Sequence, residues 1–190
     1  HTNGQGVFAH RLSERLAAAG QDVQVMLPSE SLHTHCSREA GVQMCAIAAL
    51  PLAPLDPDVR VTPQPGRWTG RLVDAFEPEV IHIQDHYPLC RSVMRVARER
   101  GLATVGTNHF LPGNMTAYVP LITRFSAARK AIRGLLWKLV LDVYNQADIV
   151  AAPTETAASI LRRQGIQPQV RAISNGVDLE RFHPDPDVNR

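Results

Sequence analysis

Polar side chains that could do chemistry follow two short, β-rich runs of this sequence. Asp85 and His86 come directly after one run, and Asn108 and His109 come after another. A histidine near neutral pH can donate a hydrogen bond to a phosphate or to a sugar hydroxyl. From its position alone, His109 either contacts such a ligand or only caps its strand.

Two glycines near the start, Gly4 and Gly6, open the first helical pattern. Glycines at a helix N-terminus let backbone N–H groups approach an anion, and the helix dipole favours negative charge there. The spacing fits NAD poorly, because no acidic residue ends the predicted strand that closes at Leu27. The glycines therefore mark either a phosphate or sugar contact or a plain tight turn.

Other catalytic and metal-binding patterns are weak. His82, Asp85 and His86 have no Gly-x-Ser-x-Gly segment to pair with, so a Ser-His-Asp triad is excluded. Three cysteines without framework spacing predict a reducing compartment and no disulfide scaffold. Four soft side chains could hold zinc, but their spacing is not that of a known site, and we prefer a polar surface loop there; they are His33, His35, Cys36 and Cys45. We therefore expect no metal.

Length and composition are those of one globular domain. The chain has 190 residues, of which 44% are hydrophobic and 20% charged, with a formal net charge of +2. Its aliphatic content excludes intrinsic disorder, and no apolar run approaches the roughly 18 residues of a membrane span. So small a net charge gives no reason to expect nucleic acid as a partner.

The elements that would position the polar residues alternate between strand and helix. This order predicts βαβ units and a Rossmann-like α/β fold, with a parallel sheet layered with helices. Residues 29–66 are expected to form a loop-rich excursion that contains two possible strands, 42–48 and 59–62. The other expected strands are 23–27, 79–84, 103–107, 148–152 and 170–173, and the expected helices are 7–16, 67–76, 89–100, 121–145 and 154–163.

Ligands of such a sheet bind outside the carboxyl ends of its strands. Five segments are therefore expected at one edge: 4–6, 85–87, 108–110, 153–155 and 175–176. From these we assign contacts with an acceptor or a phosphate to Gly4, Gly6, Asp85, His86 and Asn108.

The long helix expected over 121–145 combines an apolar face with a basic strip. The helical period places Phe125, Ala128, Ile132, Leu135, Leu136, Leu139 and Val143 on a face expected in the core. Trp137 falls away from that face, beside a strip of five cations without an acid: Arg124, Arg129, Lys130, Arg133 and Lys138. The strip and Trp137 fit an anionic membrane surface. The alternative is a solvated face whose tryptophan is covered by a neighbouring segment.

Four segments resemble the N-terminal, acceptor-binding domain of retaining glycosyltransferases of the GT-B fold, and most closely the bacterial family 4 members that glycosylate lipids. They are 4–12, 80–86, 107–112 and 173–182. The resemblance implies that His109 donates a hydrogen bond to the donor sugar and that Gly4 and Gly6 border the acceptor and the donor diphosphate. The last segment is similar to the interdomain linker of that family and contains Asn175, Gly176, Val177 and Asp178.

The resemblance further implies transfer of a hexose from a nucleotide sugar such as UDP- or GDP-hexose, without a metal or other cofactor. The acceptor would be a lipid or lipid-linked molecule at the cytoplasmic membrane face, or in a variant of this hypothesis a small soluble molecule. Residues 1–173 would form the acceptor domain and 174–190 the linker to a C-terminal donor domain. That domain and a strand before Gly4 are not in the sequence, so we expect the chain alone to be marginally stable and inactive. A second interpretation is a non-catalytic Rossmann-type binding or interaction domain.

Overall fold

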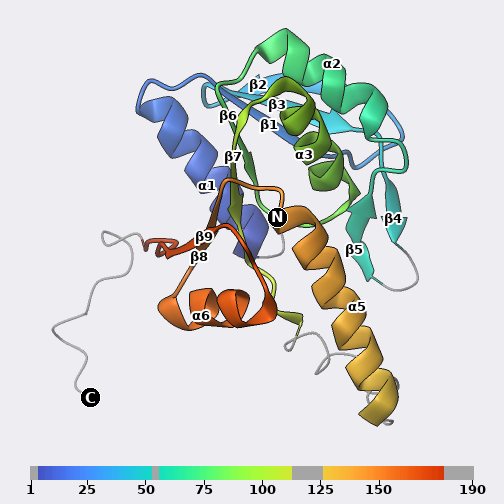
Figure 1. The fold of residues 1–190 in the computed structure, drawn as a ribbon. Helices are drawn as coiled ribbons and strands as arrows, with labels where there is room; N and C mark the ends of the chain where they lie inside the picture. The colour runs from blue at the N-terminus through green and yellow to red at the C-terminus, as the bar shows by residue number, and fades with distance from the viewer. Residues whose placement is uncertain (1–3, 53–55, 113–125, 178–190) are drawn as a thin grey trace, which may run out of the picture.

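The computed structural model describes residues 4–52, 56–112 and 126–177, which form an α/β fold (Figure 1). The helices are α1 (Gly4–Ala18), α2 (Gly66–Phe76), α3 (Pro88–Arg100), α5 (Ser126–Tyr144) and α6 (Glu155–Gln164). The strands are β1 (Val23–Pro28), β2 (His35–Glu39), β3 (Val42–Ile47), β4 (Leu50–Leu52), β5 (Asp56–Val61), β6 (Val80–Ile83), β7 (Ala103–Thr107), β8 (Ile149–Ala152) and β9 (Gln169–Ala172). The α/β class is confirmed, and each expected element has a counterpart within a few residues.

The strands in the second half of the described chain form one parallel sheet. Its strands lie in the order β6-β7-β8-β9, and each pair of neighbours is parallel. Ile81 and Ile83 alternate with more exposed residues along β6 and are buried in the core. The helix α3 packs on β6 and β7, and α6 packs on β8 and β9. These crossovers bring the carboxyl ends of the four strands to one edge.

A separate sheet forms in the region expected to be loop-rich. Its strand order is β1-β3-β2, with β1 parallel and β2 antiparallel to β3, and β4 and β5 form an antiparallel ribbon. Ala40 and Gly41 join β2 to β3 with φ angles of 49° and 82°. Left-handed backbone at both positions is what a two-residue hairpin requires. The two strands expected within residues 29–66 are present as β3 and β5, but β2 and β4 were not expected, so the region is less loop-rich than predicted. Strand β2 was missed because it is exposed throughout and has no apolar pattern that could reveal it.

The β2–β3 hairpin also contains a disulfide, which was not expected from the number and spacing of the cysteines. Its register places Cys36 opposite Cys45, and the two form a disulfide with 4.1 Å between their Cα atoms. The zinc alternative thereby loses both of its sulfur ligands. The third cysteine, Cys90, is free.

The packing of α5 differs from the expectation as well. Trp137 is 9% exposed and belongs to the core with Val140 and Tyr144, whereas Leu135 and Leu139 are 59% and 38% exposed. Figure 1 shows the reason: the first half of α5 extends away from the rest of the molecule, so only its second half packs against the body. The aromatic face of that second half is buried, because large rings contribute most to burial. The expected outward position of Trp137 is therefore wrong. No helix in the described ranges is long and apolar enough to cross a membrane.

Candidate active site

Three segments that are distant in sequence meet at the carboxyl edge of β6 and β7. Gln5 at the start of α1 donates from Nε2 to Asp85 Oδ2 at 3.4 Å. One turn further along α1, the ring of Phe8 lies 4.9 Å from the ring of His109. Residues three apart share a helix face, so α1 presents both side chains to the strand ends. The N-terminus of α1 and the residues that follow β6 and β7 therefore surround one site.

His109 lies at the centre of this site and is half-buried. Its Nε2 lies 3.0 Å from Oε1 of Gln84, the residue directly after β6. Burial lowers the pKa of His109, and Asp85 opposes this shift in part. The ring is consequently neutral at pH 7. An amide oxygen can only accept, so Nε2 carries the proton and Nδ1 is an acceptor.

The parallel register of β6 and β7 explains this pairing. His82 and Gln84 are two residues apart and lie on the same side of their strand. His82 Nε2 lies 2.7 Å from Thr107 Oγ1, and Gln84 reaches His109. Two cross-strand hydrogen bonds thus bind the end of β6 to the end of β7.

His86 is a buried residue whose ring lies close to an aromatic neighbour. Its ring centroid lies 5.0 Å from that of Phe110, and the residue is 8% exposed. Burial lowers the pKa of His86; Asp85 raises it and Arg91 lowers it further. The buried Nδ1 atom has no hydrogen-bond partner in the described part of the chain. His86 is therefore a buried ring that lies between the aromatic rings of Tyr87 and Phe110 and whose pKa is below its ordinary value.

Asn108 and Asp85 hold backbone in place. Asn108 is 2% exposed, and its backbone N–H donates to the carbonyl of Ala151 at 2.9 Å, which ties the end of β7 to β8. The Asn108 side chain is buried as well, and its Nδ2 has no hydrogen-bond partner in the described part of the chain. Asp85 Oδ1 accepts from the backbone N–H of Tyr87 at 2.7 Å. Its carboxylate therefore orients the entry into α3.

The first glycine of the site faces open space. A Cβ atom built on Gly4 would meet no atom within 4 Å. The described packing therefore does not require glycine at this position. Among the described residues, none lies against the Cα atom of Gly4.

Other residues predicted for the site are less closely tied to it. Thr154 caps α6, since its Oγ1 accepts from the backbone N–H of Ala157 at 3.1 Å. Asn175, Gly176 and Val177 are exposed, and no described contact joins them to His109. Asp178 and Arg124 lie outside the described residues. The remaining cations of the strip are exposed on α5: Arg129, Lys130, Arg133 and Lys138.

Sequence reasoning assigned no role to Gln5 and Phe8, nor to Gln84 beyond its face of the strand. The alternation along β6 was the available signal for Gln84, since it places this residue beside His82. No sequence pattern indicated that the start of α1 would contact the residues that follow β6 and β7. In the described ranges, no three His, Cys, Asp or Glu side chains lie together as a metal site.

Comparison with known families gives one match. The family model described as Glycosyltransferase Family 4 matches residues 2–181, which is nearly the whole chain. No curated protein sequence matches the chain significantly.

Proposed function

The chain belongs to glycosyltransferase family 4, and on this premise we propose that it forms the acceptor-binding part of a retaining enzyme that transfers a hexose from a nucleotide sugar to a lipid or lipid-linked acceptor. The observation that carries the proposal is the contact of the first turns of α1 with the half-buried His109 ring and with Asp85 at the strand ends. A second domain, reached through the linker at 174–190, would deliver the nucleotide sugar.

The site is expected to accelerate the reaction by positioning the two substrates and by stabilising the negative charge that develops on the leaving group. The bond between the anomeric carbon and the diphosphate oxygen breaks, and the bond to the acceptor hydroxyl forms on the same face of the sugar. The acceptor proton leaves with the diphosphate. The N-terminus of α1 favours the negative charge that develops on the leaving group, because its N–H groups and its dipole point toward an anion.

The role of His109 depends on its hydrogen bond to Gln84. In the observed pairing the Nε2 proton is held by Gln84, and Nδ1 can accept from a sugar or acceptor hydroxyl. Donation to the donor sugar, which the family resemblance implies, requires that Nε2 exchange Gln84 for the sugar. Either contact fixes the reacting sugar relative to the helix N-terminus, which is the contribution that positioning makes to the rate.

The lipid acceptor is supported by the surface of α5. Its projecting half carries exposed Arg129, Lys130 and Arg133, and the exposed Leu135 and Leu139 follow them. Exposed cations and exposed leucines on one projecting helix fit the interface of an anionic membrane, to which each cation contributes about 1 kcal/mol. Trp137 takes no part in this surface because it lies in the core. We place the enzyme on the cytoplasmic face of the membrane.

The catalytic assignment is tested by His109→Ala in the complete enzyme. We expect turnover to fall by about 100-fold or more, the usual contribution of a positioned hydrogen-bonding group. His33→Ala is the matched control, because His33 is an exposed histidine outside the site. Sugar transfer is measured with radiolabelled nucleotide sugars and lipid extract. Unchanged turnover in the His109 variant would remove this histidine from the mechanism.

The membrane assignment is tested by co-sedimentation with vesicles that contain or lack anionic lipid. Replacing Arg129, Lys130 and Arg133 with glutamine should weaken binding to anionic vesicles by about a hundredfold, at about 1 kcal/mol per charge. A control variant loses the same charge from three other elements, at Arg15, Arg163 and Arg171. Equal loss in both variants, or equal binding to neutral vesicles, would contradict a specific role for α5.

A further inference from the structure

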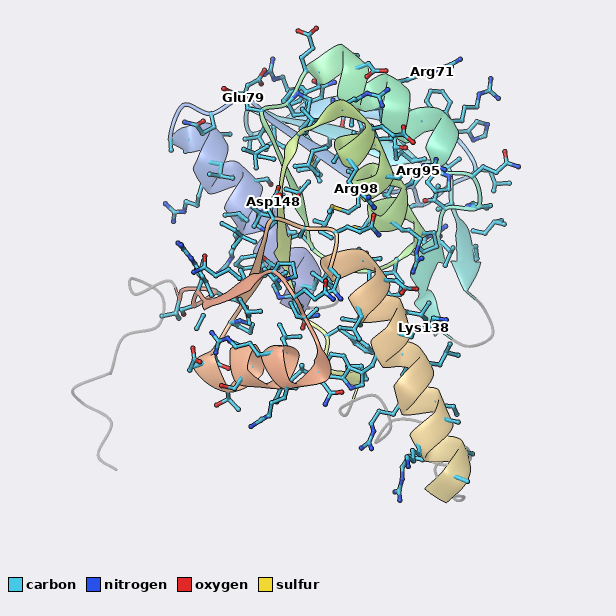
Figure 2. All side chains as sticks on the ribbon, viewed as in Figure 1. Arg71, Glu79, Arg95, Arg98, Lys138 and Asp148 are labelled. Atoms are coloured by element: carbon cyan, nitrogen blue, oxygen red, sulfur yellow. A yellow bond between two sulfur atoms is a disulfide. The ribbon has the colours of Figure 1, made fainter. Side chains whose placement is uncertain are left out.

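The charges of this chain are unevenly distributed over its helices. Helix α2 packs on α3, and α3 packs on α5. These three helices carry ten of the chain's 20 Lys and Arg residues but three of its 18 Asp and Glu residues, so the remainder is net negative although the whole chain has a net charge of +2. In Figure 2, Arg71, Arg95 and Lys138 lie along the right side of the molecule, and Glu79 and Asp148 lie to their left. The layer formed by α2, α3 and α5 is therefore a positive face.

The outer surface of α3 is a stripe of arginines. Arg91, Arg95 and Arg98 follow one another at spacings of four and three residues, which places them on one face of the helix. All three are exposed, whereas Val93 on the inner face is buried in the core. The ion pair of Arg95 with Glu99 is long, at 3.9 Å, and lies in solvent. The amphipathic pattern of α3 thus presents guanidinium groups along its whole outer side.

Contacts between the helices make this stripe continuous with α2 and α5. A Cβ atom built on Gly66, in the first turn of α2, would lie 2.8 Å from Nη2 of Arg95. On the other side, Nη2 of Arg91 lies 3.7 Å from Oδ2 of Asp142 on α5. Lys138 is exposed one turn before Asp142 on the same side of α5. One basic surface therefore extends from α2 over α3 to α5.

Several cations of this surface have no acidic partner. Arg67, Arg71 and Arg98 are exposed and form no ion pair within the part of the chain that the structure describes. Arg100 differs, because it pairs with Asp74 across the contact between α3 and α2. Unpaired charges of one sign raise the positive potential above the surface, which attracts an extended anionic partner.

We propose that the outer faces of α2 and α3 bind an anionic lipid bilayer together with α5, so that this layer of helices lies against the membrane. The inference rests on the proposed function, which places a lipid acceptor near α5. Guanidinium groups bind lipid phosphates through paired hydrogen bonds, and an anionic leaflet attracts cations within a Debye length of about 8 Å at physiological salt. The exposed Leu135 and Leu139 on α5 favour a bilayer over a soluble polyanion, because leucine side chains gain free energy from burial at the acyl boundary.

Co-sedimentation of the complete enzyme with vesicles of phosphatidylcholine and phosphatidylglycerol tests the proposal. The test variant removes three unpaired cations from α2 and α3, and it combines Arg67→Gln, Arg71→Gln and Arg98→Gln. We expect it to bind about a hundredfold more weakly than the unsubstituted enzyme. The matched control loses the same charge from other elements, at Arg15, Arg163 and Arg171, and should stay within about fivefold of the unsubstituted enzyme. Thermal unfolding and transfer to a detergent-solubilised acceptor should be alike in both variants, because no described contact joins the three substituted arginines to His109.

The result separates this inference from the proposed function. If the test variant binds like the control while substitution of Arg129, Lys130 and Arg133 weakens binding, the inference is overturned and the proposed role of α5 stands. Binding of the unsubstituted enzyme to polyphosphate but not to anionic vesicles would overturn it as well, because the surface would then recognise a soluble polyanion. Failure of the proposed function would appear separately, as no sugar transfer by the complete enzyme to any lipid acceptor.

Discussion

Gly106 is the position where the structure allows the sharpest test of how the site is held. A Cβ atom at this position in β7 would lie 2.7 Å from Cδ1 and 2.9 Å from Cε1 of Tyr144. The tyrosine is fully buried on α5, and its hydroxyl donates to the carbonyl of Thr107 at 2.9 Å. Burial raises the pKa of Tyr144 well above its ordinary value, so the hydroxyl remains a donor. The close approach of β7 and α5 therefore requires glycine.

Gly106→Ala should lower the free energy of unfolding by about 2–3 kcal/mol. Overpacking a well-packed core costs about 1–3 kcal/mol, and displacing the Tyr144 hydroxyl from its buried acceptor costs about 1 kcal/mol more. Alanine in place of glycine lowers the conformational entropy of the unfolded chain, which offsets about 0.5 kcal/mol of this cost. Urea denaturation followed by circular dichroism measures the difference. Because Thr107 directly precedes Asn108 and His109, the same variant should also reduce transfer by the complete enzyme.

Two further variants identify the cause. Gly134→Ala, on an exposed part of α5 where a Cβ meets nothing within 4 Å, should stabilise the protein by about 0.5–1 kcal/mol. In a Tyr144→Leu background the cost of Gly106→Ala should fall by about 1 kcal/mol or more, because the two sites are in contact. A Gly106→Ala protein within about 0.5 kcal/mol of wild type, or a cost that the Tyr144→Leu background leaves unchanged, would refute the argument.

The other predictions concern the disulfide, a buried histidine and the glutamine beside the site. The Cys36–Cys45 disulfide closes a loop with a sequence separation of 9, and its reduction should lower the free energy of unfolding by about 2–3 kcal/mol. Thiol titration of the untreated, denatured protein should find Cys90 as the one free thiol. Three free thiols would contradict the pairing. Burial lowers the pKa of His86 in the folded state, so its contribution to stability is complete above about pH 6.5 and is lost as the pH falls below that value, by at most about 1.4 kcal/mol per pH unit. Denaturation at pH 7 and pH 5 measures this slope, which should be smaller in His86→Phe; an unchanged slope would exclude His86 as its source. Gln84→Leu removes the acceptor at 3.0 Å from His109 Nε2 and should lower kcat. It should also shift the ¹⁵N signals of the His109 ring toward a mixture of tautomers. If Gln84 had only a structural role, those signals would stay unchanged.

Much of the fold followed from local pattern. Strand β7 was predicted over its observed range, and α2, α3 and α6 within a residue or so at each end, because each has a clear apolar period and a glycine or proline at a boundary. Strands β2 and β4 were missed, since an exposed edge strand and a three-residue strand carry no apolar alternation. Helices and strands are thus predictable where the burial of one face gives the sequence a periodic apolar pattern.

The positions of the candidate site residues after the strands were predictable for the same reason. Polar residues after apolar strands can be read from sequence, and Asp85, His86, Asn108 and His109 do follow β6 and β7. Their individual surroundings could not be read in this way. The pairing of Gln84 with His109 depends on the register of two strands, and the contact of Phe8 with His109 depends on how α1 packs.

Local patterns in the sequence were enough to predict most of the strands and helices, and with them the polar residues at the strand ends, because the periods of 2 and 3.6 residues are local properties of the chain. Tertiary packing was needed to show that Trp137 is buried while Leu135 is exposed, and that Cys36 pairs with Cys45. These outcomes depend on which distant segments cover a surface or lie opposite one another. Such contacts follow from the packing of the whole chain and leave no periodic signal in a single segment.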